Sequence, residues 1–205
     1  MHNRFFILSL YNMRATVLTV PLLSMAVMFI FCLENAHQSL DLSVMVSLLY
    51  LLPAVLLVQE VVSSIQNDFK DGIIENWLGN GSEAISYIGC KIACCALFSG
   101  VPFVTVSCGY LLLEYSLEHV LYVGLSLFFL SVSFISFGCL LGFSSKDKPY
   151  LGIVLLPLQV PSFLWLISGI ELGNHLYPLM FSFGVMLMSV SLSLLLSGFT
   201  KQSLF

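Results

Sequence analysis

The sequence predicts an all-α membrane protein with six transmembrane helices. Of 205 residues, 59% are hydrophobic and 9% are charged, whereas a soluble domain carries about 25% charged residues. Several apolar runs are also long enough to cross the roughly 30 Å hydrocarbon layer of a bilayer. The few basic residues, moreover, all fall on one side of these runs. We therefore expect one membrane domain that covers residues 1–205.

Polar interruptions divide the apolar sequence into six predicted spans. These spans lie at about 16–33, 42–59, 88–113, 120–143, 150–170 and 176–199. An even number of spans places both termini on the same side of the membrane. The first run follows basic residues, as in a signal peptide, but no small-x-small cleavage site follows it, so we expect a retained helix.

The distribution of charge sets the predicted orientation. With the N-terminus inside, all seven basic residues lie on or near the cytoplasmic face: Arg4, Arg14, Lys70, Lys91, Lys146, Lys148 and Lys201. The outer links hold only acidic charges: Glu34, Asp41, Glu114, Glu118 and Glu171. This agrees with the positive-inside rule and predicts a multi-pass membrane protein with cytoplasmic termini.

Composition and motifs argue against several function classes. A net charge of −4 gives no basic footprint for nucleic acid. No P-loop motif occurs, so any ATP must be used by a partner subunit. The six cysteines lie in or beside apolar runs, which favours packing over disulfides or metal binding.

We expect no enzyme activity from the chain itself. The Gly-x-Ser pattern at Gly142–Ser144 is similar to that of rhomboid intramembrane proteases, but Ser144 is predicted at the cytoplasmic end of its helix. His37, His119 and His175 are predicted at the outer face, roughly 30 Å away, so none of them can act as its base. These histidines are either solvated loop residues, which we favour, or haem ligands.

The link at 60–83 differs from the other links, which are shorter than about ten residues. Apolar residues recur in it every three or four positions, at Val62, Ile65, Phe69, Ile73 and Trp77. Polar residues fill the remaining face, at Gln66, Asn67, Asp68, Lys70, Asp71 and Glu75. This pattern predicts a cytoplasmic amphipathic helix, or two helices broken at Gly72.

Two roles suit such a helix: it rests on the bilayer, or it docks into a cytoplasmic partner. Its acidic character favours docking, because helices on anionic lipid surfaces favour Lys and Arg. After it, the turn at 79–82 ends with Ser82, which we expect to cap the next helix.

Prolines fall inside several predicted spans, at Pro21, Pro53, Pro102, Pro157 and Pro161. Each removes a backbone hydrogen bond, which is typical both of hinges along a transport path and of static kinks. The sequence leaves both interpretations open. Lys91 is the main ionisable residue within the spans, and we expect its ammonium group to reach the cytoplasmic interface.

Three motifs, in order, resemble the haem exporter protein B (CcmB) family. The segment 66–75, Gln-Asn-Asp-Phe-Lys-Asp-Gly-Ile-Ile-Glu, resembles the cytoplasmic loop of that family. Lys91, Gly100 and Pro102 match its Lys and Gly-x-Pro spacing in the third helix. The segment 155–161, with Pro157 and Pro161, matches its Leu-Pro-Leu-x-x-Pro in the fifth helix.

The resemblance implies an ABC-2-type-exporter-like permease subunit of System I cytochrome c maturation, with a coupling helix between its second and third helices. The implied partners are the ATPase CcmA, CcmC, CcmD and the haem chaperone CcmE, with two copies of the permease per complex. Haem is then a transported or handled species and ATP is bound by the partner. An exporter for another substrate, such as a lipid or drug, and a membrane scaffold without transport are the alternatives.

The same resemblance implies roles for particular residues. Gln66, Asn67, Asp68, Asp71, Gly72 and Glu75 would contact the ATPase. A second set would shape the moving helices: Lys91, Gly100, Pro102, Pro157 and Pro161. We favour mechanical coupling of ATP hydrolysis to release of the haem-loaded chaperone over a haem channel, since the spans lack a polar or His-lined path.

Overall fold

The computed structural model is all-helical in the part of the chain that it describes. That part comprises residues 42–79, 83–112, 117–144 and 176–204, with single residues at 22, 26, 157, 159, 161, 162 and 165. Its elements are α3 (Leu42–Lys70), α4 (Ile73–Gly79), α5 (Ala84–Leu112), α6 (Leu117–Ser144) and α9 (Leu176–Leu204). These described segments contain no strand, so the all-α prediction is confirmed.

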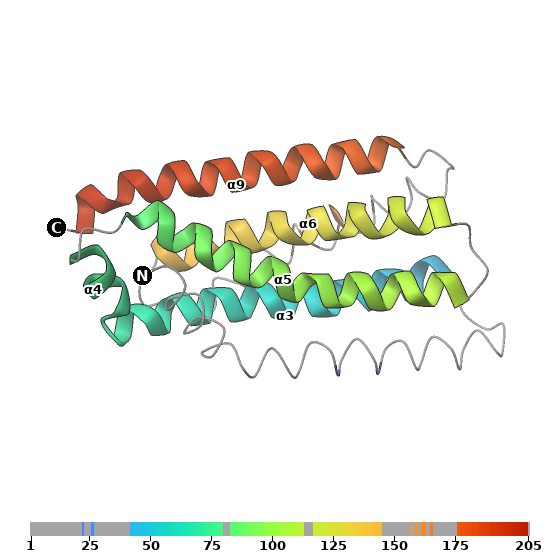
Figure 1. Ribbon diagram of the computed structural model, residues 1–205, viewed down its shortest axis with the longest axis horizontal. Coiled ribbons are helices and arrows are strands. Elements are labelled where there is room, and N and C mark those ends of the chain that lie inside the picture. Colours follow the sequence, from blue (N-terminus) through green and yellow to red (C-terminus); the bar gives the residue numbers. More distant parts are fainter. Residues whose placement is uncertain are drawn as a thin grey trace.

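The four long helices form an elongated bundle, with α4 folded across one end (Figure 1). Each has 28 or 29 residues, which corresponds to roughly 42 Å at 1.5 Å per residue. These helices contain the predicted spans at 42–59, 88–113, 120–143 and 176–199, except for residue 113, which lies outside the described residues. α3 continues eleven residues beyond its predicted span. The predicted spans at 16–33 and 150–170 lie almost wholly outside the described residues.

Two of the described helical segments are long and apolar enough to cross a membrane, namely Val120–Ser144 and Leu176–Ser197. A shorter apolar helical segment is Ala84–Gly100. The structure is therefore compatible with a membrane protein, whereas the number of six spans stays a prediction.

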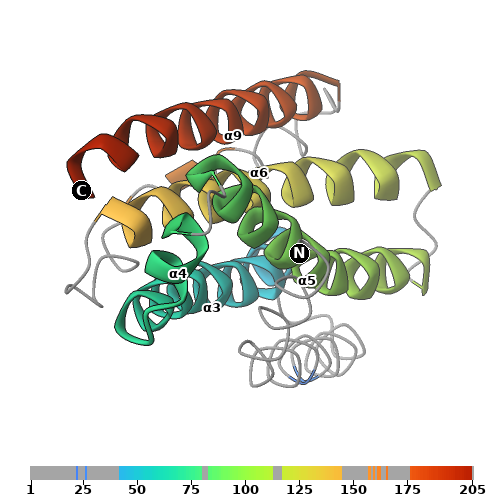
Figure 2. The ribbon, with the colours of Figure 1, turned by 60° about the vertical axis from the view of Figure 1, so that its left-hand side comes forward.

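The chain direction places the same end of several helices together. α3 ends, α5 begins, and both α6 and α9 end beside α4 (Figures 1 and 2). Lys70 and the backbone of Lys201 lie at this end, whereas Glu118 lies in the first turn of α6 at the other end. The arrangement agrees with the charge asymmetry expected from the sequence.

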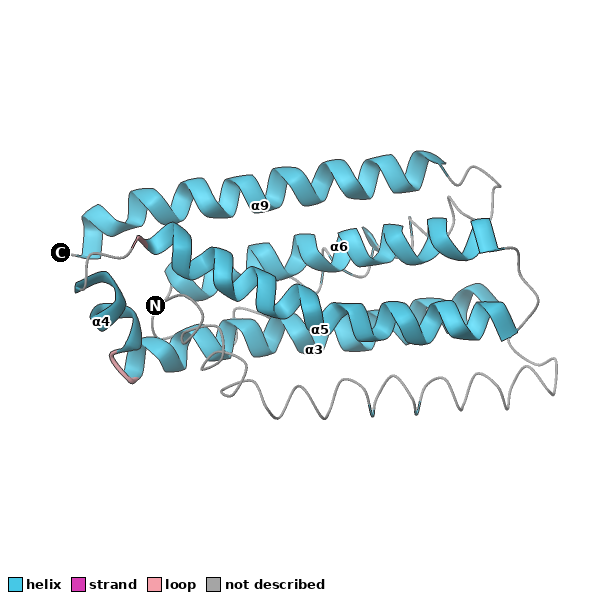
Figure 3. Cartoon of the chain, in the orientation of Figure 1, coloured by secondary structure: helices cyan, strands magenta, loops and turns pink. Residues whose placement is uncertain are grey.

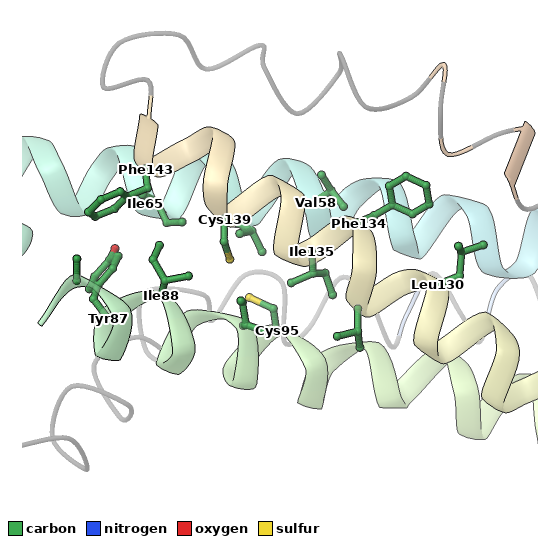
Figure 4. Packing of buried hydrophobic residues seen from close by; sticks show 14 of the residues in the cluster. Val58, Ile65, Tyr87, Ile88, Cys95, Leu130, Phe134, Ile135, Cys139 and Phe143 are labelled. Atoms are coloured by element: carbon green, nitrogen blue, oxygen red, sulfur yellow. The ribbon is translucent and has the colours of Figure 1, made fainter. Parts of the chain in front are cut away.

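The apolar core lies between α3, α5 and α6 (Figure 4). It includes Val58 and Ile65 of α3, Ile88 of α5, and Ile135 and Phe143 of α6, all of them buried. α6 is the central helix, since it packs against α3, α5 and α9. Burial of these side chains on three helices fixes their relative register.

Two glycines let α6 approach α3 closely. A Cβ atom at Gly138 would lie 3.2 Å from Val58 Cγ1, and one at Gly142 would lie 3.2 Å from Val62 Cα. The glycines are four residues apart, so they share one face of α6. Such small-xxx-small spacing is typical of close contacts between membrane helices.

α9 has the reverse of the usual amphipathic pattern. Its buried positions include the small residues Ser182, Ser189, Ser193 and Ser197. Its exposed positions carry large apolar side chains, among them Tyr177, Met180, Phe181, Leu187, Met188, Leu192 and Leu195. Small polar residues toward neighbouring helices and large apolar residues outward are the pattern expected of a helix that faces lipid.

Candidate functional site

The break between α3 and α4 falls at Gly72. This residue has φ 69°, a left-handed conformation that glycine adopts without steric cost. The Asp71 amide donates to Asn67 O at 2.9 Å, and the Gly72 amide donates to Phe69 O at 3.1 Å. The Asn76 amide then donates to Gly72 O at 3.0 Å, which begins the next helix. Figure 3 shows this turn between the two helices.

We call residues 66–79 the elbow. Of the two alternatives predicted for this segment, one amphipathic helix or two helices broken at Gly72, the structure shows the break. The first half of the segment, however, is not a separate helix, because α3 continues from Leu42 to Lys70 without interruption. The apolar stripe explains the continuity: Val62, Ile65 and Phe69 are buried in the bundle core and extend α3 beyond its predicted span.

α4 is held against the start of α5. Ile74, Trp77 and Leu78 are its buried residues. The Trp77 indole Nε1 donates to the backbone oxygen of Glu83 at 3.4 Å. The apolar face of the elbow is therefore covered by the chain's own bundle rather than left open for a bilayer or a partner.

Four polar side chains meet inside the bundle next to the elbow. Lys91 Nζ lies 2.8 Å from Asp68 Oδ2 and donates to Ser64 Oγ at 2.7 Å. The Tyr87 hydroxyl donates to the same Asp68 oxygen at 2.7 Å. We call Ser64, Asp68, Tyr87 and Lys91 the buried polar cluster, which joins the last two turns of α3 to the first two turns of α5.

Burial makes charged groups in this cluster unfavourable unless they are paired. The side chains of Lys91 and Asp68 are 0% and 2% exposed, and a charge removed from water is strongly unfavourable unless it is paired and hydrogen-bonded. Lys91 also lies 5.9 Å from the centre of the Tyr87 ring, within the range of a cation–π contact. The short Lys91–Asp68 contact is therefore the condition under which both charges can stay inside.

This geometry corrects the expectation for Lys91. Its ammonium group does not reach the interface, because it is buried against Asp68. The physical reason is the length of α3: since that helix runs on to Lys70, it carries a carboxylate to the level of Lys91. The described part of the bundle therefore holds two buried charged residues, Asp68 and Lys91, whereas the predicted spans included only Lys91.

Aromatic rings close the cluster on the side of α6. The ring centre of Phe143 lies 5.6 Å from that of Phe69 and 6.1 Å from that of Tyr87. Phe143 follows Gly142, so the close approach of α6 to α3 brings this ring over the cluster. Figure 4 shows Phe143 and Tyr87 at the same end of the core.

The structure divides the residues predicted to contact an ATPase. Asn67, Asp71 and Glu75 are exposed and Gly72 is partly exposed. Gln66 and Asp68 are only 3% and 2% exposed. The side chains of Gln66 and Asp68 are buried in the bundle, so only the exposed residues of this set can contact a partner. Asp68 instead pairs with Lys91 inside the bundle.

The second predicted set is dispersed. Lys91 belongs to the cluster, whereas Gly100 follows it by nine residues, roughly 13 Å along α5, and lines an apolar cavity. Pro102 lies within α5, with its side chain outside the described residues. Pro157 and Pro161 are exposed. The described contacts do not bring these residues together into one site.

Sequence analysis did not single out Ser64 or Tyr87. Their spacing held a signal, since Ser64 precedes Asp68 by four residues and Tyr87 precedes Lys91 by four. Residues four apart share a helix face, so two polar pairs on consecutive helices were visible. Only the packing of α3 on α5 shows that the two faces meet.

Comparisons with known proteins did not identify a family for this chain. A scan against protein-family models, a search of curated proteins and a search of solved structures each found no match. The chemistry of the site must therefore be argued from its own geometry.

That geometry links α3 to α5 inside the bundle. The four side chains of the cluster are buried. Among the described residues, no group of three or more His, Cys, Asp or Glu side chains is arranged to hold a metal ion. The exposed polar surface beside it, formed by Asn67, Asp71 and Glu75, is the part that a partner can reach.

Proposed function

We propose that this chain is the membrane subunit of an ABC-type complex, and that its elbow receives mechanical work from a partner ATPase. The observation that carries the proposal is the exposed acidic face of the elbow, formed by Asp71 and Glu75, at one end of an apolar bundle. The chain has no P-loop of its own. An ATPase subunit with a basic groove is the partner that this surface fits.

The link from the elbow to the bundle supports mechanical coupling. The elbow is continuous with α3 and is hydrogen-bonded to the start of α5 through Trp77. A displacement of Asp71 or Glu75 therefore acts on two long helices at once. A loosely tethered surface helix would not transmit force in this way.

The specific assignment proposed is cytochrome c biogenesis. Its support is the resemblance of three short motifs, at 66–75, at Lys91 with Gly100 and Pro102, and at 155–161, to the haem exporter protein B family. In this proposal ATP hydrolysis by CcmA drives haem export or release of the haem-loaded chaperone CcmE. CcmC and CcmD complete the complex in the inner membrane.

We favour chaperone release over passage of haem through the chain. Neither Val120–Ser144 nor Leu176–Ser197 contains an Asp, Glu, Lys, Arg or His residue. The haem propionates carry negative charge, and these two helices offer no cationic side chain to neutralise it. Mechanical coupling requires no such path.

Two measurements test the proposal together. The tagged chain, purified in mild detergent, should retain an ATPase and a haem-handling protein. Deletion of its gene should abolish covalent haem staining of c-type cytochromes. Normal staining in the deletion strain would remove the cytochrome assignment, and purification without any ATPase would remove the ABC assignment.

One observation favours a second candidate, an exporter of a lipid or another apolar substrate. A cavity of about 310 Å³ lies between α5 and α6, lined by Ala96, Leu97, Gly100, Val104, Leu125 and Phe128. This volume is at the lower end of that of small-molecule sites. Altered lipid distribution or efflux in the deletion strain, with normal cytochromes, would favour this candidate.

A further inference from the structure

We propose that Asp68 and Lys91 are positioning residues that hold the elbow in the orientation displaying Asp71 and Glu75. The inference deepens the proposed function, since it assigns a purpose to the buried polar cluster at the docking surface. It rests on where the pair lies: Asp68 is in the last turn of α3, three residues before Asp71.

The buried pair sets the orientation of the end of α3. Asp68 is 2% exposed, while its neighbours Asn67 and Lys70 are exposed. Without a cation beside it, the carboxylate would be buried without its counter-charge, so it would take up a proton unless the end of α3 rotated or unwound to bring it to water. Because Asp71 follows within one turn, the same movement would redirect Asp71.

The other end of the elbow is also held by the start of α5. Trp77 donates to Glu83 O at 3.4 Å, and the amides of Ser86 and Tyr87 donate to the same oxygen at 3.1 and 3.3 Å. The Tyr87 hydroxyl in turn donates to Asp68. The start of α5 therefore binds α4 through Glu83 and α3 through Tyr87 and Lys91, and the elbow is held at both ends.

Lys70 differs from Lys91 in its exposure to solvent. This lysine is in the same turn of α3 as Asp68, but it is exposed, and exposed charges contribute little to stability. The two lysines therefore separate the effect of a buried pair from the effect of positive charge near the elbow. Lys70→Met is the matched control for Lys91→Met.

Hydrogen–deuterium exchange of the full chain in lipid nanodiscs tests the inference. Lys91→Met should speed amide exchange in α4 (Ile73–Gly79) by about tenfold or more, because local opening there no longer has to break the buried pair. Exchange in α9 between Ser182 and Ser197 should rise by a smaller factor than exchange in α4, because the pair joins α3 to α5. Lys70→Met should change neither segment.

A reversed pair adds a readout that a purely steric role would not give. The double variant Asp68→Lys/Lys91→Asp should bring exchange in α4 back toward that of the unaltered protein, since opposite charges still face each other. If Lys91→Met does not accumulate as folded protein, Tyr87→Phe provides the milder variant. It removes one donor to Asp68 and should raise exchange in α4 by less, in the same segment.

Unchanged exchange in α4 in both Lys91→Met and Tyr87→Phe would overturn the inference. So would an equal increase in α4 and α9, since this would show general destabilisation rather than positioning. The measurement involves this chain alone. If no ATPase co-purifies, faster exchange in α4 would still support the positioning role of the pair. If exchange in α4 does not change, binding of an ATPase is still tested separately by purification.

Discussion

Gly142 of α6 and Val62 of α3 approach so closely that a Cβ atom on the glycine would lie 3.2 Å from the valine Cα. The same added atom would lie 3.3 Å from Ile65 Cβ. Backbone and Cβ atoms cannot rotate away, so this contact sets how near the two helices lie. It also determines that Phe143, the next residue, covers Phe69 and Tyr87.

Gly142→Ala should therefore destabilise the protein by about 1–3 kcal/mol, the usual effect of overpacking a core. The control is Gly184→Ala on α9, where an added Cβ meets nothing within 4 Å. That substitution should be neutral or slightly stabilising, because alanine favours helix. Thermal unfolding in detergent measures both. Equal melting temperatures for the two variants would contradict the close approach of α6 to α3.

The buried pair predicts a large coupling between Asp68 and Lys91. Removing either partner alone, by Asp68→Asn or Lys91→Met, should cost about 3–5 kcal/mol, because the remaining charge is left buried. The double variant should cost less than the sum of the two. A double-mutant cycle on unfolding free energy measures the coupling; additive effects would show that the two charges do not depend on each other.

The buried face of α9 carries small serines and its exposed face carries large apolar residues. A change of side-chain size should therefore affect stability on the buried face much more than on the exposed face. Ser193 is buried, and its hydroxyl lies within hydrogen-bonding distance of two backbone oxygens, Ser136 O at 2.9 Å and Ser189 O at 2.8 Å. Ser193→Leu should separate α9 from α6 and destabilise the protein by about 1–3 kcal/mol. Leu192→Ala, on the exposed face, should stay within about 0.5 kcal/mol of the unaltered protein. A larger loss from Leu192→Ala than from Ser193→Leu would reverse the assigned faces.

The two tryptophans of the chain provide a test of membrane insertion. Trp165 is 44% exposed and packs on Tyr177 and Phe181, with ring centres 6.0 and 4.7 Å away. Exposed Trp and Tyr near the end of an apolar span are typical of the membrane interface. Trp77→Phe leaves Trp165 alone, and its fluorescence should be quenched more by lipids labelled near the headgroup than by lipids labelled near the chain end.

Trp77 supplies the comparison, since it is 5% exposed and is shielded by the bundle. In Trp165→Phe the remaining fluorescence should respond weakly to either labelled lipid. If neither labelled lipid quenches the fluorescence of Trp165, this aromatic group lies away from lipid. That result would contradict the interpretation of α9 as a membrane helix.

The exposed acidic face predicts loss of partner binding without loss of fold. Asp71→Lys with Glu75→Lys should reduce recovery of the co-purified ATPase by about tenfold or more, because reversed charge meets the same partner surface. Exposed substitutions of this kind usually change stability by only about 0.5 kcal/mol. Glu118→Lys, an exposed acidic change at the opposite end of the bundle, is the control. Equal recovery from both variants would exclude the elbow as the docking surface.

The helical class and the locations of four long helices could be predicted from the sequence alone. Apolar runs of this length have few alternatives to helix, since each backbone group must be hydrogen-bonded within its own segment in lipid. A break at Gly72 was one of two predicted alternatives, because a polar Asp-Gly step interrupts a helical apolar pattern there. The exposure of Asn67, Asp71 and Glu75 followed from the same periodicity.

Which polar residues are buried was set by the packing of the helices on one another. Periodicity placed Asp68 with its polar neighbours, and the flanking position of Lys91 suggested a side chain that reaches water. Neither sequence pattern shows which residues of the neighbouring helix face Asp68 or Lys91. The free energy of a buried charge depends on those facing residues. The packing of α3 on α5 set Asp68 opposite Lys91, so the favourable state became a buried pair rather than two solvated charges.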